Sequence, residues 1–406
     1  MKTRVALVTH DYAGSGGVRS MTRFLYRALQ ESEQFQPEII SLALSSSDEA
    51  SVQLRKPKTW SQGVRCLKRE RGGERFVHIG AQFSEFEFQR YRPRAALNRL
   101  LQEYDLIQVV SGTPPWMCAV AEVRKPRFLW TATMTRPDRN SRLERMTGVR
   151  GLWATGMTLI AERYERRGLK SASAVFALSD YTLESVRKLL GPNAGILAPC
   201  GVDTDLFQPD LGLPKKYFLC VGRLDDARKN IAMLIEAYAR LRKENPSAPE
   251  LWLVGPQPPK EALDLISRYG LEAVVKLKGR QSGEELARLY QSALCFVLSS
   301  DEEGLGIVLL ESMASGVPVI STACGGPQMV IEHGRTGFLT RLGDPQDLAE
   351  AMQGILRNEQ LRERMGAEAR KVCEERYSIS GAGEVFVREY EKFLRRSHSG
   401  MVMAAR

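Results

Sequence analysis

The sequence predicts an α/β protein with two doubly wound, Rossmann-like domains that face each other across a cleft. Short runs rich in Val, Ile and Leu alternate with longer charged segments of helical periodicity, which is typical of βαβ units. The chain of 406 residues exceeds what one hydrophobic core comfortably serves, so two domains are expected. Ligands of such domains bind at the carboxyl ends of the strands, in the cleft.

The first predicted domain, residues 1–205, contains four clear apolar runs, each followed by a helical segment. The runs are RVALVTH (4–10), DLIQVVS (105–111), RFLWTAT (127–133) and AVFALS (174–179). Residues 44–75 are basic and lack apolar periodicity, so they predict a mobile loop. Residues 139–170 are rich in arginine around an apolar stretch, which predicts either a solvated charged face on a packed helix or a basic amphipathic helix that touches anionic lipid.

The second predicted domain, residues 206–383, repeats the alternation of apolar and charged segments. Its apolar runs are KYFLCVG (216–222), ELWLVG (250–255), VVKLKG (274–279), CFVLSS (295–300) and PVIST (318–322). Prolines and glycines interrupt both periodicities between positions 199 and 214. This interruption predicts the junction between the domains.

The charge of the chain is concentrated in its first half. Residues 1–200 hold 31 Lys and Arg against 19 Asp and Glu, a net charge of +12, whereas residues 201–406 hold 27 against 29, a net charge of −2. The basic half predicts an anionic partner, such as a phospholipid surface, a phosphate-bearing substrate or nucleic acid. Nucleic acid ranks last, because no recognisable RNA or DNA module interrupts the βα alternation.

The absence of visible targeting segments and the pattern of the cysteines predict a cytoplasmic protein. No signal peptide is visible, and no run of about 18 uninterrupted apolar residues predicts a spanning helix. The seven cysteines are scattered and none has C-x-x-C spacing, so buried thiols in a reducing compartment are expected rather than a metal or redox site.

A glycine-rich turn follows the first predicted strand and leads into a helical segment. Backbone N–H groups at such a turn can bind an anion, and Gly16 and Gly17 would let the backbone approach a phosphate closely. A tight turn without a ligand is an equal alternative, because the spacing is not G-x-G-x-x-G.

Two cations follow the first strand of the second domain. Arg223 comes directly after YFLCVG, and Lys229 precedes the next helical segment, so both are predicted to project into the cleft. A guanidinium fork and an ammonium charge together suit a leaving diphosphate. The alternative is a solvated loop in which they pair with Asp225 and Asp226.

Two glutamates flank a glycine-containing loop in the stretch DEEGLGIVLLE. Glu303 precedes the loop, and Glu311 lies in an apolar helical segment where a buried carboxylate needs hydrogen-bond partners. Sugar hydroxyls would supply such partners, and the N–H groups of residues 304–306 would face an anion or a sugar. The alternative is a pair of surface glutamates on a helix edge.

These motifs together resemble a known family. EGLGIVLLE is similar to the E-x7-E motif of retaining nucleotide-sugar glycosyltransferases of the GT-B fold, most closely those of glycosyltransferase family 4. VGRLDDARKN resembles the phosphate-binding segment of that family, GGV its glycine turn and CGVDTDLF its domain linker. SGVPVISTACGGPQMVIEHGRTGFL matches the run after the second glutamate, so the resemblance covers nearly the whole chain in the expected order.

The resemblance implies a role for each matched residue. Arg223 and Lys229 would hold the donor diphosphate and stabilise its developing charge, Glu303 would orient the donor sugar, and Glu311 would bind the ribose. Further donor-binding residues implied by the resemblance are Gly16, Gly17, Arg280, Gln281, Leu286, Gly304, Leu305 and Gly306. A terminal helix over 384–398 would cross back onto the first domain. Neither a metal ion nor a cofactor is implied, and the co-substrate would be a nucleotide-diphosphate sugar, UDP- or GDP-hexose.

The chain departs from the family at one point. Many relatives have a histidine at the end of a first-domain strand, whereas the corresponding strand here, RFLWTATMTRP, has none. Thr133, Thr135 and Arg136 are therefore the candidates for contacting the sugar or the acceptor.

The predicted function is transfer of a hexose, with retention of configuration, from a nucleotide-diphosphate donor to a hydroxyl acceptor. The basic first domain suggests a lipid-linked or envelope-glycan acceptor at the inner face of the membrane, to which the protein would bind peripherally. The alternatives are a soluble small-molecule acceptor, or a non-catalytic nucleotide-sugar-binding protein of the same fold.

Overall fold

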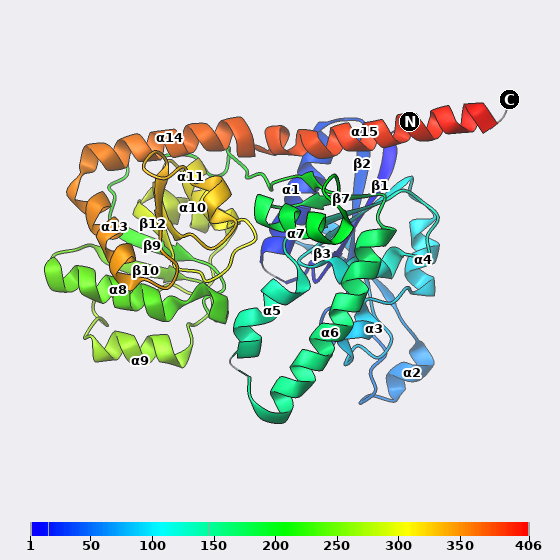
Figure 1. Ribbon diagram of the computed structural model, residues 1–406, viewed down its shortest axis with the longest axis horizontal. Coiled ribbons are helices and arrows are strands. Elements are labelled where there is room, and N and C mark those ends of the chain that lie inside the picture. The colour runs from blue at the N-terminus through cyan, green and yellow to red at the C-terminus, as the bar shows by residue number, and fades with distance from the viewer. Residues whose placement is uncertain (1, 15, 145, 405–406) are drawn as a thin grey trace.

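A computed structural model describes residues 2–14, 16–144 and 146–404, without the side chains of residues 141, 142, 144 and 396–404. Two separate sheets, each packed with helices, lie side by side (Figure 1). The predicted α/β class with two Rossmann-like domains is confirmed. The division at residues 205 and 206 stays a prediction.

The first sheet has eight strands in the order β3-β4-β2-β1-β5-β6-β7-β8. Their bounds are β1 Thr3–His10, β2 Phe35–Leu42, β3 Cys66–Arg71, β4 Glu74–Ile79, β5 Leu106–Ser111, β6 Arg127–Thr131, β7 Ala174–Ala177 and β8 Ile196–Leu197. Every pair is parallel except β3 with β4. The central strands β1 and β5 are buried on both faces, which explains their continuous apolar runs.

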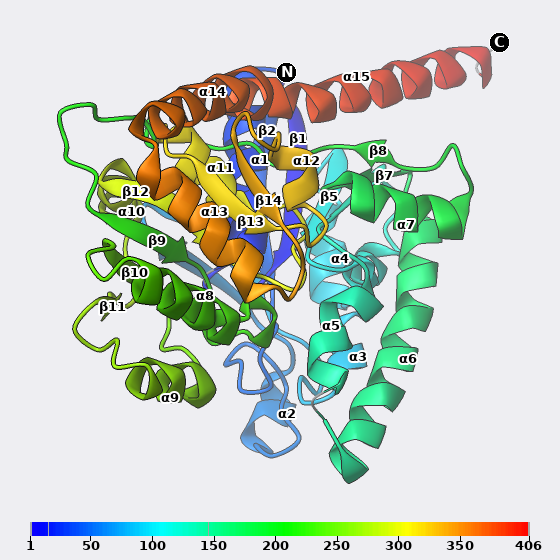
Figure 2. The same cartoon turned by 60° about the vertical axis from the view of Figure 1, so that its left-hand side comes forward.

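The helical segments of this domain connect the strands. They are α1 Gly17–Glu31, α2 Lys58–Gln62, α3 Glu87–Arg90, α4 Ala95–Leu101, the 3-10 helix η1 Pro114–Val120, α5 Thr135–Glu144, α6 Gly148–Ser171 and α7 Asp180–Leu190. Helices α5 and α6 form a hairpin that extends away from the sheet in both views (Figures 1 and 2).

The expectation of a loop over residues 44–75 is wrong for part of that region. Residues 66–71 form β3, which pairs with β4 through a tight turn at Gly72 and Gly73, both at positive φ (59° and 78°). Because β3 is an edge strand with mostly exposed side chains, it carries charged residues and shows no apolar alternation. The sequence signal for a half-buried strand is therefore absent.

The second sheet has six strands, all parallel, in the order β11-β10-β9-β12-β13-β14. They are β9 Tyr217–Val221, β10 Glu250–Val254, β11 Val275–Leu277, β12 Ala293–Leu298, β13 Val319–Thr322 and β14 Gly337–Thr340. The helical segments are η2 Ala227–Lys229, α8 Ile231–Glu244, α9 Lys260–Arg268, α10 Gly283–Gln291, α11 Ile307–Ala314, α12 Pro327–Val330 and α13 Pro345–Arg357.

Two long helices connect the domains at the end of the chain. Helix α14 (Glu359–Tyr377) lies on the second domain, and α15 (Ile379–Ala404) runs back along the first (Figure 1). Phe386 and Tyr390 of α15 are fully buried, and the Phe386 ring lies 4.7 Å from that of Trp130. Burial of two aromatic side chains anchors α15 to the first domain.

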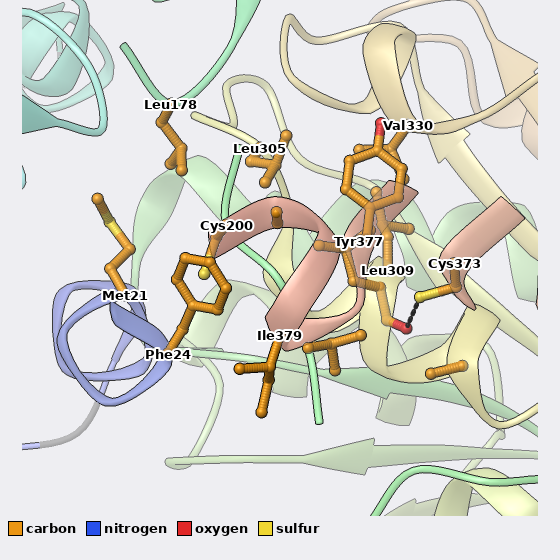
Figure 3. Packing of buried hydrophobic residues seen from close by; sticks show 14 of the residues in the cluster. Met21, Phe24, Leu178, Cys200, Leu305, Leu309, Val330, Cys373, Tyr377 and Ile379 are labelled. Carbon is orange, nitrogen blue, oxygen red and sulfur yellow. Dashed lines mark hydrogen bonds between the residues drawn. The ribbon is translucent and has the colours of Figure 1, made fainter. Parts of the chain in front are cut away.

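The two domains share a hydrophobic core where α14 meets α15 (Figure 3). Phe24 of α1 approaches the linker so closely that a Cβ at Gly201 would lie 2.5 Å from its ring. The N–H of Val202 donates to the carbonyl of Tyr377 (2.7 Å). The linker is thus packed against both domains, which limits the directions in which they can move. Among the described residues, no helix combines the length and apolarity needed to cross a bilayer.

Candidate active site

A cavity of about 1680 Å³ lies between the two domains. Residues at or just beyond the carboxyl ends of β1, β5, β6, β9 and β10 line it, together with the loop after β12. The predicted residues that line it are Gly16, Gly17, Thr133, Arg223, Lys229, Arg280, Gln281, Leu286, Glu303, Gly304, Leu305, Gly306 and Glu311. The structure therefore brings together residues that lie almost 300 positions apart in sequence.

Two helix N-termini meet in this cavity without side-chain caps. Gly16 precedes α1 with φ of 134°, and Gly306 precedes α11 with φ of 84°, and neither helix has a capping side chain. A Cβ on Gly16 would lie 4.0 Å from Cδ of Arg223, and one on Gly17 would lie 4.0 Å from Cδ1 of Ile307 in α11. Uncapped N–H groups and positive helix ends from both domains make this part of the cavity a site for an anion.

Lys229 and Glu303 form an ion pair on the wall of the second domain. The Lys229 ammonium donates to Oε1 of Glu303, and both side chains are only 14% exposed. The Ser300 hydroxyl donates to the same oxygen (2.8 Å). The loop is fixed by two backbone bonds, from the N–H of Glu303 to the carbonyl of Cys324 and from the N–H of Gly326 to the carbonyl of Glu303.

Arg223 is the more exposed of the two predicted cations. Its guanidinium lies 2.8 Å from Oδ2 of Asp226, and half of its side chain is exposed to the cavity. Burial opposes ionisation of Asp226, but hydrogen bonds from Arg228 outweigh it and hold the pKa of Asp226 below its usual range. Asp226 therefore stays charged and keeps both arginines in place.

Arg228 bridges the two domains, a role that the sequence analysis missed. Its guanidinium lies 2.9 Å from Asp226, 3.0 Å from Asp138 of α5 and 3.9 Å from Glu302. The hydroxyl of Thr133 in the first domain also donates to Oε1 of Glu302 (3.1 Å). These contacts hold the cavity in a closed arrangement. Arg228 sits inside the motif VGRLDDARKN, but nothing in the sequence indicates a partner ninety residues away.

Glu311 lines the cavity from α11. The hydroxyl of Tyr290 donates to its Oε2 (2.9 Å), and Tyr290 is itself fully buried. Burial raises the pKa of Glu311 to about 7, because one hydroxyl does not replace the water that the carboxylate loses. Additional hydroxyl donors from a ligand would favour the ionised form.

His10 contributes a group that the sequence analysis left unassigned. It ends β1 and lines the cavity, stacked on Trp116 with ring centroids 4.5 Å apart. Its Nε2 accepts from the N–H of Gly112 (3.3 Å), so the neutral ring carries its proton on Nδ1, which is buried and without a partner among the described atoms. Burial lowers the pKa of His10 to about 4. The signal available was its position at a strand end, directly before the glycine turn.

Thr135 and Arg136 do not line the cavity, unlike Thr133. The N–H of Thr135 donates to Glu165 of α6 (2.6 Å), and Arg136 pairs with Glu162 of the same helix (2.6 Å). Both residues hold α5 against α6. Because α5 begins at Thr135, the helical turn directs these side chains away from the strand end.

Arg71 and Arg90 of the first domain line the cavity and bond to backbone carbonyls. Arg71 donates to the carbonyl of Gly14 (2.7 Å), and Arg90 donates to that of Ser84 (2.8 Å). Acids also lie near both guanidinium groups, Asp11 near Arg71, and Glu87 and Glu85 near Arg90.

The fold and the cavity define a two-domain protein with an anion site and a hydroxyl-binding carboxylate between its domains. Residues 15–206 match the model for Glycosyltransferase Family 4, and residues 202–372 match that for Glycosyl transferases group 1. The chain belongs to the GT-B glycosyltransferases of family 4.

The chain spans about half the length of the curated relatives that it matches. MMP alpha-(1->4)-mannosyltransferase of Mycolicibacterium hassiacum is 30% identical over 230 residues, which are 56% of this chain and 54% of that protein. N-acetyl-alpha-D-glucosaminyl L-malate synthase of Bacillus anthracis is 30% identical over 237 residues, 56% and 60% of the two chains. D-inositol 3-phosphate glycosyltransferase of a Nocardioides species is 31% identical over 194 residues, 42% of each chain.

Solved structures match over nearly the whole chain. Sucrose-phosphate synthase of Thermosynechococcus elongatus superposes with a TM-score of 0.74 and 20% identity, covering 97% of this chain and all of that one. HepE of Anabaena, solved with UDP and glucose, gives a TM-score of 0.69 and 19% identity over 96% of this chain and all of the other. At such identities the likeness shows the fold alone.

Proposed function

We propose that this protein is a retaining glycosyltransferase that moves a hexose from UDP- or GDP-hexose to a hydroxyl acceptor. The observation that carries the proposal is the convergence, in one interdomain cavity, of two cations, two carboxylates and two uncapped helix N-termini. The curated relatives, named as glycosyltransferases, and the neighbour that holds UDP and glucose support it.

In this proposal the donor spans both walls of the cavity. Its diphosphate lies at Gly16 and Gly17 and contacts Arg223 and Lys229, while the ribose hydroxyls donate to Glu311. In the closed arrangement Lys229 is already held by Glu303, so the ammonium is positioned before the donor arrives. Preorganised charge of this kind stabilises a developing oxyanion without reorganisation during the reaction.

The chemical step follows from that arrangement. The bond between the anomeric carbon and the diphosphate oxygen breaks, and the acceptor oxygen bonds to the same carbon from the same face. The departing phosphate oxygen takes the acceptor proton, and Arg223 and Lys229 neutralise the charge on the diphosphate. Glu303 accepts hydrogen bonds from the sugar hydroxyls and fixes its orientation.

The acceptor is proposed to carry negative charge and to be lipid-linked, with the protein bound peripherally at the inner membrane face. The net charge of +12 on residues 1–200 supports an anionic acceptor, because the first domain supplies one wall of the cavity. A soluble phosphate-bearing acceptor is the second candidate, supported by the relative named for inositol 3-phosphate.

The test is a donor screen of the purified protein against UDP-, GDP-, ADP- and dTDP-sugars by thermal shift, followed by nucleotide release for each binder. We expect one nucleotide to raise the melting temperature, and Glu311→Ala to abolish that shift. Glu272→Ala, which removes an exposed glutamate outside the cavity, is the matched control and should retain it. Binding without nucleotide release, even with candidate acceptors, would favour the non-catalytic binding protein.

A further inference from the structure

The outer face of α6 exposes an unusual concentration of large apolar side chains. Val149, Leu152, Trp153 and Leu159 are 83%, 76%, 65% and 49% exposed. Their spacing places them on one side of the helix, over a length of about 15 Å. Single exposed apolar residues are ordinary on a protein surface, whereas four on one helical face indicate an interaction site.

The same face becomes basic toward the end of the helix. Arg163, Arg166, Arg167 and Lys170 continue the three- and four-residue spacing, and all four are exposed. None of them forms an ion pair among the described side chains. The two acids of this segment are turned inward, since Glu162 pairs with Arg136 and Glu165 accepts from the N–H of Thr135.

The apolar part of α6 is also continuous with the mouth of the cavity. Leu143, Met146, Val149, Trp153 and Met157 line the cavity, so that Val149 and Trp153 belong to both surfaces. The hairpin of α5 and α6 projects beyond both sheets, which leaves its outer face open (Figures 1 and 2). Arg145, one of the arginines of the basic segment 139–170, lies outside the described residues.

We propose that α6 docks the protein on an anionic phospholipid bilayer, with its apolar first turns inserted and its basic last turns at the headgroup phosphates. The apolar and basic parts follow one another along one face of α6. If the helix enters the bilayer at a tilt with its first turns leading, the apolar side chains reach the acyl chains and the basic ones stay at the headgroups. The cavity mouth then opens at the bilayer surface, where a lipid-linked acceptor lies. This inference rests on the proposed function only for the identity of that acceptor.

The test is flotation of the full chain with vesicles of phosphatidylcholine alone and of about three parts phosphatidylcholine to one part phosphatidylserine. We expect binding to the anionic vesicles and a loss of about ten-fold or more in the double variant Leu152→Ser, Leu159→Ser, since neither leucine lines the cavity. Arg166→Gln with Arg167→Gln should abolish the preference for anionic vesicles. The matched control is Leu211→Ser, which removes a leucine that is 94% exposed in the linker.

Three results would overturn the inference. The first is wild-type protein that does not float, and the second is a leucine double variant that floats as well as the control. The third is a wild-type dimer that becomes monomeric in the double variant, which would assign the apolar face to a second copy of this chain. Nucleotide release without vesicles separates the two proposals: release with no flotation contradicts only the docking surface, and flotation with no release contradicts only the proposed chemistry.

Discussion

Glu311 should make the unliganded protein less stable as the pH rises. Its pKa is raised by burial to about 7 from an ordinary value of 4.5. An acid whose pKa is raised by folding stabilises the folded state below its unfolded pKa, and that contribution is lost as the pH rises through the folded pKa. At about 1.4 kcal/mol per pH unit, the loss between about pH 4.5 and pH 7 amounts to about 3 kcal/mol, an upper value because the carboxylate borders the cavity.

The variant Glu311→Gln isolates this effect. Its amide keeps the shape and still accepts from the Tyr290 hydroxyl, but it has no charge to desolvate. In urea unfolding, we expect the variant to exceed wild type by up to about 3 kcal/mol at about pH 8 and to differ little at about pH 5. The control Glu272→Gln should show no difference that depends on pH. If the difference for Glu311→Gln is the same at both pH values, the reasoning on its burial is refuted.

Three further outcomes follow from the cavity. Lys229→Met should lower nucleotide release by about 100-fold or more, because it removes a preorganised cation from the leaving diphosphate. Release rates close to those of wild type would show that Lys229 does not stabilise the leaving diphosphate. Asp138→Asn should increase the fraction of molecules with open domains and so raise the mean radius of gyration measured by X-ray scattering. The lost ion pair with Arg228 is worth about 1 kcal/mol or less, because both side chains are partly exposed. Adding Arg228→Met to the same chain should cause no further opening. Additive effects of the two substitutions would contradict a direct contact between Asp138 and Arg228. His10→Phe should keep the aromatic stack on Trp116. It should lower nucleotide release by about ten-fold, because the variant lacks the Nδ1–H hydrogen-bond donor. Burial lowers the pKa of His10 to about 4. The pH profile of nucleotide release by the wild-type protein should therefore show no titration near pH 6.5, and a titration there would contradict the buried neutral ring.

The sequence alone was sufficient for strands such as β1, β5, β9 and β12, but it missed β2 and β4 inside the first sheet as well as β3 at its edge. Central strands such as β1 and β12 are buried on both faces, so their residues form continuous apolar runs that stand out in any reading. Strand β3 is solvated at the edge, and its CLKRER pattern differs little from that of a basic loop. Only its pairing with β4 identifies β3 as a strand. Such pairing depends on two segments together, so the local sequence of β3 does not reveal it.

The same distinction separates the site residues that were predicted from those that were not. Arg223 and Glu303 follow buried strands directly or within a few residues, so their position at the sheet edge can be read locally. The bridge from Arg228 to Asp138 depends on how the two domains approach each other, which no local pattern encodes. Thr135 was placed in the cavity because it follows a strand by a few residues, but the start of α5 at that residue redirects its side chain.

The uneven charge of the chain takes on a physical meaning once the ion pairs are located. In the second domain the cavity cations are matched by acids, Arg223 by Asp226 and Lys229 by Glu303, in agreement with its nearly balanced charge. In the first domain, Arg19, Arg23 and Arg139 of the cavity wall also pair with acids. The end of α6, by contrast, carries four exposed cations that form no ion pair among the described side chains. Matched cations keep a fixed geometry for a donor that brings its own charge, whereas unmatched ones attract an anionic partner from solution. The unmatched positive charge on α6 therefore lies where a membrane would arrive, and not where the donor is held.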